Sequence, residues 1–317
     1  MATQRIPLNL FGTSFGLVGL AGCWVTAGAQ GHVTDAVGNA LLALTAVVWL
    51  ATVGFYLRYV LTTRGAFVAD LLDDVGSPFA ALALITPMLL ASEGIAPHAP
   101  TAGKVLVDVF LVLTVLAGGW FTGQWIYGPL ALDRLHPGYF LPTVAGGFVA
   151  ATSAAQVGQE RLAQAMFGLG IACWFILGSM IMARLFFRPP LPPPLMPTLA
   201  IEMAPPAVGS VAYFALDGNR LDIVAAGLAG YGLVMVGAQL RLLPGYLRLG
   251  FAPSTWSFAF SWAAVVTTTL HWNELGRPDG RTVYTYLLLA AITAFVGGIA
   301  ARTVLAVVRR QLLPKGS

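Results

Sequence analysis

Charge is what this chain lacks most. Asp, Glu, Lys and Arg together make up 9% of its 317 residues, whereas apolar residues make up 57%. A soluble domain has about a quarter of its residues charged, because charged side chains keep its surface in water. The composition therefore excludes a soluble globular protein and predicts an all-α, polytopic membrane protein.

Cysteine and histidine are also scarce, and this narrows the possible chemistry. The only cysteines, Cys23 and Cys173, lie in apolar segments, which predicts buried thiols without a disulfide. The four histidines are spread from His32 to His271 without the spacing of metal ligands. Because the sequence also has no P-loop or Ser-His-Asp pattern, we expect no metal, no cofactor and no enzymatic activity.

Long polar inserts are missing too, so residues 1–317 are predicted to form a single transmembrane domain. The short polar start, Met1 to Pro7, has no cleavage site after it, and we expect no cleaved signal peptide. Hydropathy and turn residues mark ten apolar segments. These are Leu8–Ala27, Ala36–Leu61, Leu71–Ser92, Val105–Tyr127, Tyr139–Val157, Leu162–Phe187, Leu199–Leu216, Ile223–Leu243, Thr255–Trp272 and Val283–Val308.

The basic residues are distributed unevenly between alternate loops. Twelve of the 17 Lys and Arg fall on the side of the two termini. Cytoplasmic loops carry the excess of Lys and Arg, so both termini are predicted to be cytoplasmic. The net charge of +4 thus reflects topology and not nucleic-acid binding. The five residues on the other side are Lys104, Arg161, Arg220, Arg277 and Arg281.

Odd- and even-numbered segments differ in character. Odd segments contain prolines and close-packing glycines, whereas even segments are smoother and end in basic residues. A proline frees a carbonyl group that water in a pore can satisfy. We therefore predict five hairpins whose odd helices line a central pore and whose even helices lie outside; the alternative is that the prolines only bend packed helices. The predicted lining residues are Gly12, Ser14, Gly16, Pro78, Pro87, Pro142, Gly146, Pro205, Ala264 and Thr267.

The ninth segment, Thr255–Trp272, is uncharged and begins with the aromatic sequence WSFAF. Trp256, Phe260, Ala264 and Thr267 follow one another at helical spacing and share one face. This pattern predicts a helix that faces the pore. A lipid-facing aromatic helix fits the composition equally well.

Acidic residues occur in two places that bear on chemistry. Asp70, Asp73 and Asp74 resemble the Mg²⁺-diphosphate clusters of membrane prenyltransferases. Without a second cluster for a two-metal site, stabilisation of a helix N-terminus is the favoured role. Glu202, inside a segment, is either a proton site of a coupled transporter or a structural hydrogen-bond acceptor; we favour the second, since a fixed negative charge does not help an anion to pass.

Four motifs in order identify a known family: HPGYFLP from His136, IEMAPPAVG from Ile201, GYGLVMVGAQLRLLP from Gly230 and WSFAF from Trp256. The chain resembles the tellurite-resistance/dicarboxylate transporter family, which includes bacterial TehA-like proteins and plant slow anion channels. The resemblance implies a homotrimer, with a pore of five inner helices in each protomer. It also implies that Phe260 plugs this pore.

Together these observations predict an anion channel, or channel-like transporter, of the bacterial inner membrane. The resemblance suggests small monovalent anions or C4-dicarboxylates as cargo, and the expected partners are these anions, the bilayer and two further copies of the chain. One alternative is a proton-coupled dicarboxylate or sulfite exporter that uses Glu202. A less favoured one is a lipid-modifying enzyme that uses the cluster Asp70, Asp73 and Asp74.

The predicted topology is testable with single cysteines in a background that lacks Cys23 and Cys173. A cysteine at His98 should react with an impermeant thiol reagent applied from the periplasm. Cysteines at Thr63 and Pro190 should be protected in intact cells, because the basic side of the protein faces the cytoplasm. The opposite labelling pattern would overturn the orientation.

Overall fold

The computed structural model describes residues 5–217 and 220–313, and every regular element in these residues is a helix. Eight helical stretches are long and apolar enough to cross a membrane, which confirms an all-α, polytopic membrane protein. Lys315, one of the twelve basic residues on the side of the termini, lies outside the described residues. The eight stretches are Leu8–Ala29, Asp35–Thr62, Ser77–Ile95, Pro100–Tyr127, Glu160–Phe187, Pro193–Leu216, Ile223–Tyr246 and Arg281–Val308.

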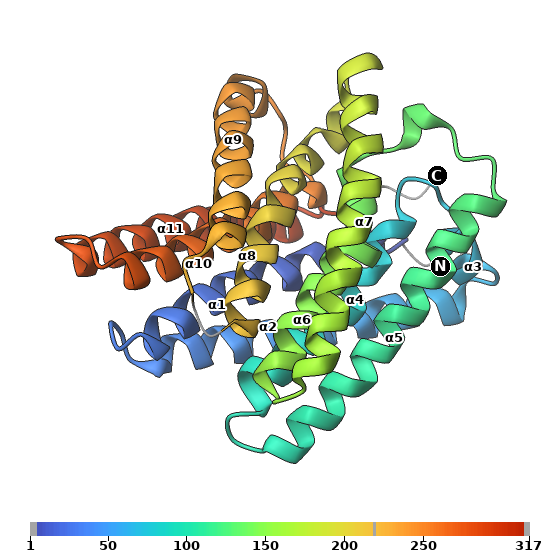
Figure 1. Ribbon diagram of the computed structural model, residues 1–317. Coiled ribbons are helices and arrows are strands. Elements are labelled where there is room, and N and C mark those ends of the chain that lie inside the picture. Colours follow the sequence, from blue (N-terminus) through green and yellow to red (C-terminus); the bar gives the residue numbers. More distant parts are fainter. Residues whose placement is uncertain (1–4, 218–219, 314–317) are drawn as a thin grey trace.

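The long helices form two layers (Figure 1). Helices of the inner layer make a closed ring, in which each packs against the next and α10 packs against α1. The inner layer consists of α1 (Phe11–Ala29), α4 (Leu82–Leu89), α6 (Gly146–Gln156), α8 (Ala204–Leu216) and α10 (Trp256–Gly276). The outer layer consists of α2 (Asp35–Thr62), α5 (Pro100–Tyr127), α7 (Glu160–Phe187), α9 (Ile223–Tyr246) and α11 (Arg281–Val308).

Burial separates these layers clearly. Between 17% and 28% of each outer helix is buried, against 56% to 72% of the inner stretches that contain α1, α4 and α8. The outer helices therefore present apolar side chains to the surroundings, as lipid requires, while the inner helices are enclosed by protein. This alternation along the chain agrees with the predicted difference between odd and even segments.

Irregular turns interrupt the inner layer and not the outer one. Pro205 and Pro206 lie in the first turn of α8, where a missing N–H breaks no hydrogen bond, and a long 3-10 stretch precedes them. Such breaks are tolerated at membrane depth when protein surrounds them. The short elements are η1 (Leu8–Leu10), α3 (Ala66–Leu71), η2 (Ser77–Ala81), η3 (Leu90–Ile95), η4 (Leu132–Arg134), η5 (Pro137–Phe140), η6 (Leu141–Ala145), η7 (Pro193–Met203) and η8 (Pro253–Thr255).

Two of the ten predicted segments are not among the eight long apolar stretches. Tyr139–Val157 is divided between η5, η6 and α6, and Thr255–Trp272 corresponds to α10, whose Ser and Thr side chains lower its hydropathy. The third segment also runs further than predicted, because η3 extends it to Ile95. The number of ten crossings stays a prediction.

A buried histidine fixes the turn that leads into η5. The Nε2 of His136 donates to the carbonyl of Val75 at 3.0 Å, and its Nδ1 accepts from the N–H of Gly138 at 3.1 Å. Burial lowers the pKa of His136 to about 4, because the charged imidazolium would be cut off from water. The neutral ring therefore belongs to the folded state.

This pKa predicts acid destabilisation. The pKa of His136 is lower in the folded than in the unfolded protein, so its contribution is complete above about pH 6.5 and is lost as the pH falls towards 4. The loss should reach on the order of 3 kcal/mol. Thermal unfolding in detergent at pH 7.5 and pH 5 measures it: wild type should lose more stability on acidification than His136→Gln. His98→Gln, at an exposed site, is the control, and equal acid sensitivity of all three proteins would contradict the assignment.

Candidate functional site

Three cavities lie in a row inside the molecule and share residues at their junctions. The mouth cavity, about 180 Å³, is bordered by Arg5 and Asp70 and shares Asn9 and Ser254 with the next one. That second, central pocket is small, about 30 Å³. The third, which we call the vestibule, has about 390 Å³ and meets the central pocket at Phe260.

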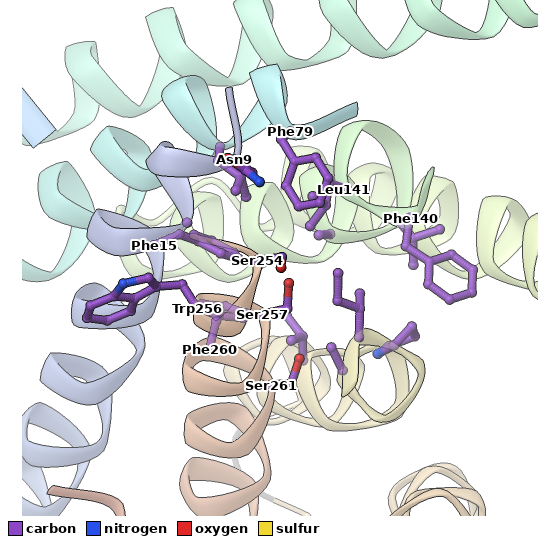
Figure 2. A pocket seen from close by; sticks show the side chains of 18 of the residues that line it. Asn9, Phe15, Phe79, Phe140, Leu141, Ser254, Trp256, Ser257, Phe260 and Ser261 are labelled. Carbon is purple, nitrogen blue, oxygen red and sulfur yellow. The ribbon is translucent and has the colours of Figure 1, made fainter. Parts of the chain in front are cut away.

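Phe260 lies where the central pocket meets the vestibule. Its ring lines both the central pocket and the vestibule. It stacks on the ring of Phe15 in α1, with 3.6 Å between ring centroids and 15° between ring planes (Figure 2). A Cβ atom built on Gly19 would lie 3.0 Å from Cδ2 of Phe260, so a glycine in α1 makes room for this ring. The stacked pair thus lies at the junction of the two cavities, with Phe260 on both sides of it and Phe15 on the side of the central pocket.

The central pocket is uncharged and partly hydroxylic. Ser254, Ser257 and Ser261 run down one side of it, where η8 continues into α10 (Figure 2). Asn9 lies on another side, and its buried Oδ1 has no hydrogen-bond partner in the described part of the chain. Such a lining offers hydroxyl and amide dipoles to a passing solute without fixing a charge at the constriction.

One face of α10 continues from the constriction into the vestibule. Phe260, Ala264, Thr267 and His271 all line that cavity. Trp256, predicted for the same face, also borders the central pocket, but its indole turns to the outer layer and donates to the hydroxyl of Thr303 at 2.9 Å. Trp256 thus borders the central pocket only, whereas Phe260, Ala264 and Thr267 border the vestibule.

Four of the ten predicted lining residues border these cavities: Gly12 and Pro205 the central pocket, Ala264 and Thr267 the vestibule. The other six do not border them. Ser14 is fully buried and its hydroxyl donates to the carbonyl of Phe11. Gly16 packs against Trp256 and Ala259, and Gly146 packs against Thr114. The carbonyl of Pro142 lies beside Gly118, and Pro78 is buried in η2. Pro87 borders a separate groove of about 550 Å³, together with Trp49 and Phe110.

These differences have a common reason. A glycine or proline inside a membrane helix is needed as often for close helix contact as for a cavity. Gly16 shows this: a Cβ there would lie 2.6 Å from Cε3 of Trp256. Composition cannot separate the two uses, because both require a small side chain on the inner face.

Sequence analysis missed two residues in prominent positions. Phe15 was passed over because a single aromatic residue in the first segment carries no signal by itself. Glu93 was left outside because the predicted third segment ended at Ser92, whereas the structure continues to Ile95 and brings Glu93 to the vestibule.

The acidic cluster is occupied by protein partners. Arg5 contacts Asp70 at 2.9 Å and Asp73 at 3.4 Å, and the hydroxyl of Tyr56 donates to Asp70 at 3.3 Å. Arg134 lies 3.7 Å from Asp74. Within residues 5–217 and 220–313, no group of three His, Cys, Asp or Glu side chains is placed to hold a metal ion. The carboxylates thus fix the chain around the mouth cavity.

Comparison with known proteins decides the family. The sequence model of a family described as voltage-dependent anion channel matches residues 5–304. The chain belongs to this family. The resemblance predicted from the four motifs is thereby confirmed, and the family is one of anion channels and transporters and not of enzymes.

Two relatives show the breadth of this family. The chain is 28% identical to the tellurite resistance protein TehA homolog of Haemophilus influenzae over 277 residues, which cover 85% of this chain and 83% of that protein. It is 24% identical to the S-type anion channel SLAH2 of Arabidopsis thaliana over 327 residues, which cover 98% of this chain. The match spans 61% of the plant protein, so this chain corresponds to less than two thirds of it.

Glu202 lies away from the row of cavities. It is buried in η7, and its Oε1 has no hydrogen-bond partner among the described residues. Because it borders neither the central pocket nor the vestibule, we expect Glu202→Gln to leave anion flux through liposomes within about twofold of wild type and insensitive to an imposed pH gradient. Loss of a proton-driven flux in this variant would instead identify Glu202 as a coupling site.

Proposed function

We propose that the protein is an anion channel, or channel-like transporter, whose permeation path runs through the mouth cavity, the central pocket and the vestibule. The observation that carries this proposal is the position of Phe260 at the junction between a nearly filled pocket and an open cavity. Membership of an anion channel family supplies the class of cargo. The ring of inner helices around the row of cavities supports their role as pore lining.

The proposed mechanism is steric closure. The stacked rings of Phe260 and Phe15 border a pocket of only about 30 Å³, which has no room for a hydrated anion, and an apolar constriction also excludes water. When Phe260 turns aside, the hydroxyls of the central pocket replace part of the hydration shell. Weak dipoles of this kind allow an anion to enter and also to leave, as rapid conduction requires.

The proposed cargo and the proposed mode of transport rest on different observations. Small monovalent anions and C4-dicarboxylates are both proposed cargo on the strength of the family resemblance. A passive path is favoured over a proton-coupled exporter that uses Glu202, because this residue borders neither the central pocket nor the vestibule. A lipid-modifying enzyme is disfavoured because arginines and a tyrosine already occupy the cluster Asp70, Asp73 and Asp74.

We further propose the bacterial inner membrane as location, cytoplasmic termini and a homotrimer. The bias of the basic residues supports the orientation, and the likeness to a protein of Haemophilus influenzae supports a bacterial membrane. The trimer rests on the family resemblance. Chemical cross-linking of the protein in membranes, which should give trimers as its largest product, tests it.

Truncation of the proposed gate should open the channel. We expect Phe260→Ala to raise anion conductance at least tenfold over wild type, because the removed ring is the barrier between the central pocket and the vestibule. Planar-bilayer recordings at matched protein amounts measure this.

Phe258→Ala is the matched control. The ring of Phe258 packs edge-on against Tyr246 of α9, with 4.8 Å between centroids, and does not border the central pocket or the vestibule. This variant should lose packing without gaining conductance. If Phe260→Ala conducts no better than Phe258→Ala, Phe260 is an ordinary packing residue.

A further inference from the structure

One arginine of this protein is enclosed by the fold. Arg184 lies in the last turn of α7 and is only 2% exposed, whereas none of the other described Lys and Arg side chains is buried. Its Nη2 donates to the backbone carbonyl of Asp133 at 3.2 Å. Its Nε and Nη1 are buried without a hydrogen-bond partner among the described residues. A guanidinium has five N–H donors, so most donors of Arg184 are unused.

The charge of Arg184 cannot be removed by the loss of a proton. A guanidinium stays protonated in proteins even when it is enclosed, in contrast to a carboxyl group. No described Asp or Glu lies within 4 Å of it. A charge that is enclosed without a counter-ion costs several times more than an exposed one. Arg184 therefore favours an anion beside it.

The groups around Arg184 do not offset its charge. The carbonyl end of α7 carries only about half of a negative charge. His136, whose ionisation the charge of Arg184 opposes, is neutral and donates to the carbonyl of Val75. Asp133 presents its backbone carbonyl to Arg184, while its carboxylate lies 3.7 Å from Nε of Arg188. The nearest acidic residue thus pairs with a different arginine.

Two guanidinium groups converge on Asp133. Arg184 holds its carbonyl, and Arg188, one turn further along, lies beside its carboxylate. This ion pair is long, and the side chains of Arg188 and Asp133 are 49% and 62% exposed, so it stabilises the fold little. Residues 131–134 are all exposed. A stronger anion can therefore displace Asp133 from between the two arginines.

The depth of this place in the membrane favours a phosphate group. The 28 residues of α7 rise about 42 Å, against about 30 Å for the hydrocarbon core, so its ends reach the headgroup layer. Arg184, in the last turn, is within reach of lipid headgroups and of soluble ions. The fork of a guanidinium matches the oxygen atoms of a phosphate group, and the multiple charge of this group suits two arginines better than one.

We propose that Arg184 and Arg188 form a binding site for a phosphate group, which takes the place of Asp133 between them. Neither arginine borders the mouth cavity, the central pocket or the vestibule, so this site is independent of the proposed channel function. The phosphate group belongs to an anionic phospholipid or to a soluble ion. Its binding fixes the connection into η5 and η6, which bring Phe140 and Leu141 to the central pocket.

Thermal unfolding of lipid-depleted protein in an uncharged detergent tests the site with inorganic phosphate. Phosphate, compared with chloride at equal ionic strength, should raise the Tm of wild type by at least about 2 °C. Arg184→Gln should lose this shift. Arg184→Lys, which keeps the charge without the fork, should retain about half of it or less. Arg241→Gln removes an exposed arginine without an ion pair in the described chain and is the matched control, with the full shift expected.

A second arm of the experiment identifies the source of the phosphate group. Dihexanoyl phosphatidylglycerol replaces inorganic phosphate, and dihexanoyl phosphatidylcholine, which has no net charge, is its control. An Arg184-dependent shift with phosphatidylglycerol and not with phosphate assigns the site to a lipid headgroup. The reverse result assigns it to a soluble phosphate.

Asp133→Asn gives a readout that a purely structural role of Arg184 would not change. This variant keeps the backbone carbonyl but loses the competing carboxylate. It should lower the half-saturating concentration of the effective probe about three- to tenfold. The measurement also serves if Arg184→Gln does not fold. Where Arg184→Gln folds, its Tm without phosphate should be no lower than that of wild type, because an enclosed charge is removed.

Three results would contradict the proposal. A wild-type Tm that neither phosphate nor phosphatidylglycerol raises overturns the site. A shift of equal size in wild type, Arg184→Gln and Arg241→Gln places the bound phosphate elsewhere and also overturns it. An unchanged half-saturating concentration in Asp133→Asn overturns the exchange with Asp133.

Discussion

The close approach of α1 and α10 is the contact on which the rest of the inner layer depends. Gly16 and Gly19 have no side chain, and the space they leave is filled by Trp256, Ala259 and the ring of Phe260. Interiors are packed too tightly to accept an extra carbon at distances below 3 Å without movement. These two glycines therefore set how near α10 lies to α1, and so where Phe260 meets Phe15.

Two concentric layers let this inner arrangement be irregular. The outer helices are continuous, long and exposed, so their backbone polar groups are satisfied within each helix, as lipid demands. Behind them, the inner layer can contain 3-10 and π turns such as η3, η6 and η7. η3 shows the consequence, because this turn continues the third span and brings Glu93 to the vestibule. Irregular backbone is thus confined to the layer that surrounds the cavities.

Charge is kept to the two ends of the row of cavities. At the mouth, Arg5 offsets Asp70 and Asp73. At the vestibule, Arg281 offsets Glu274, and Glu93 forms no ion pair with any residue that the structure describes. Between them the lining has hydroxyls, an amide and aromatic rings. On the proposed path, a solute in the middle meets dipoles and no fixed ion, which favours passage over tight binding.

The sequence alone determined the class and predicted the alternation of inner and outer helices, because lipid and water impose composition rules on each segment. Four motifs indicated the family, and the resemblance drew attention to Phe260. The sequence could not determine which small residues border a cavity: Gly12 does and Gly16 does not, although they stand one turn apart. It also could not show that the ring of Phe15 stacks on the ring of Phe260. Nor could it show that Glu93 has no ion-pair partner among the described residues. Those facts depend on how α1, η3 and α10 are rotated against one another, and rotation is set by packing between segments distant in the chain.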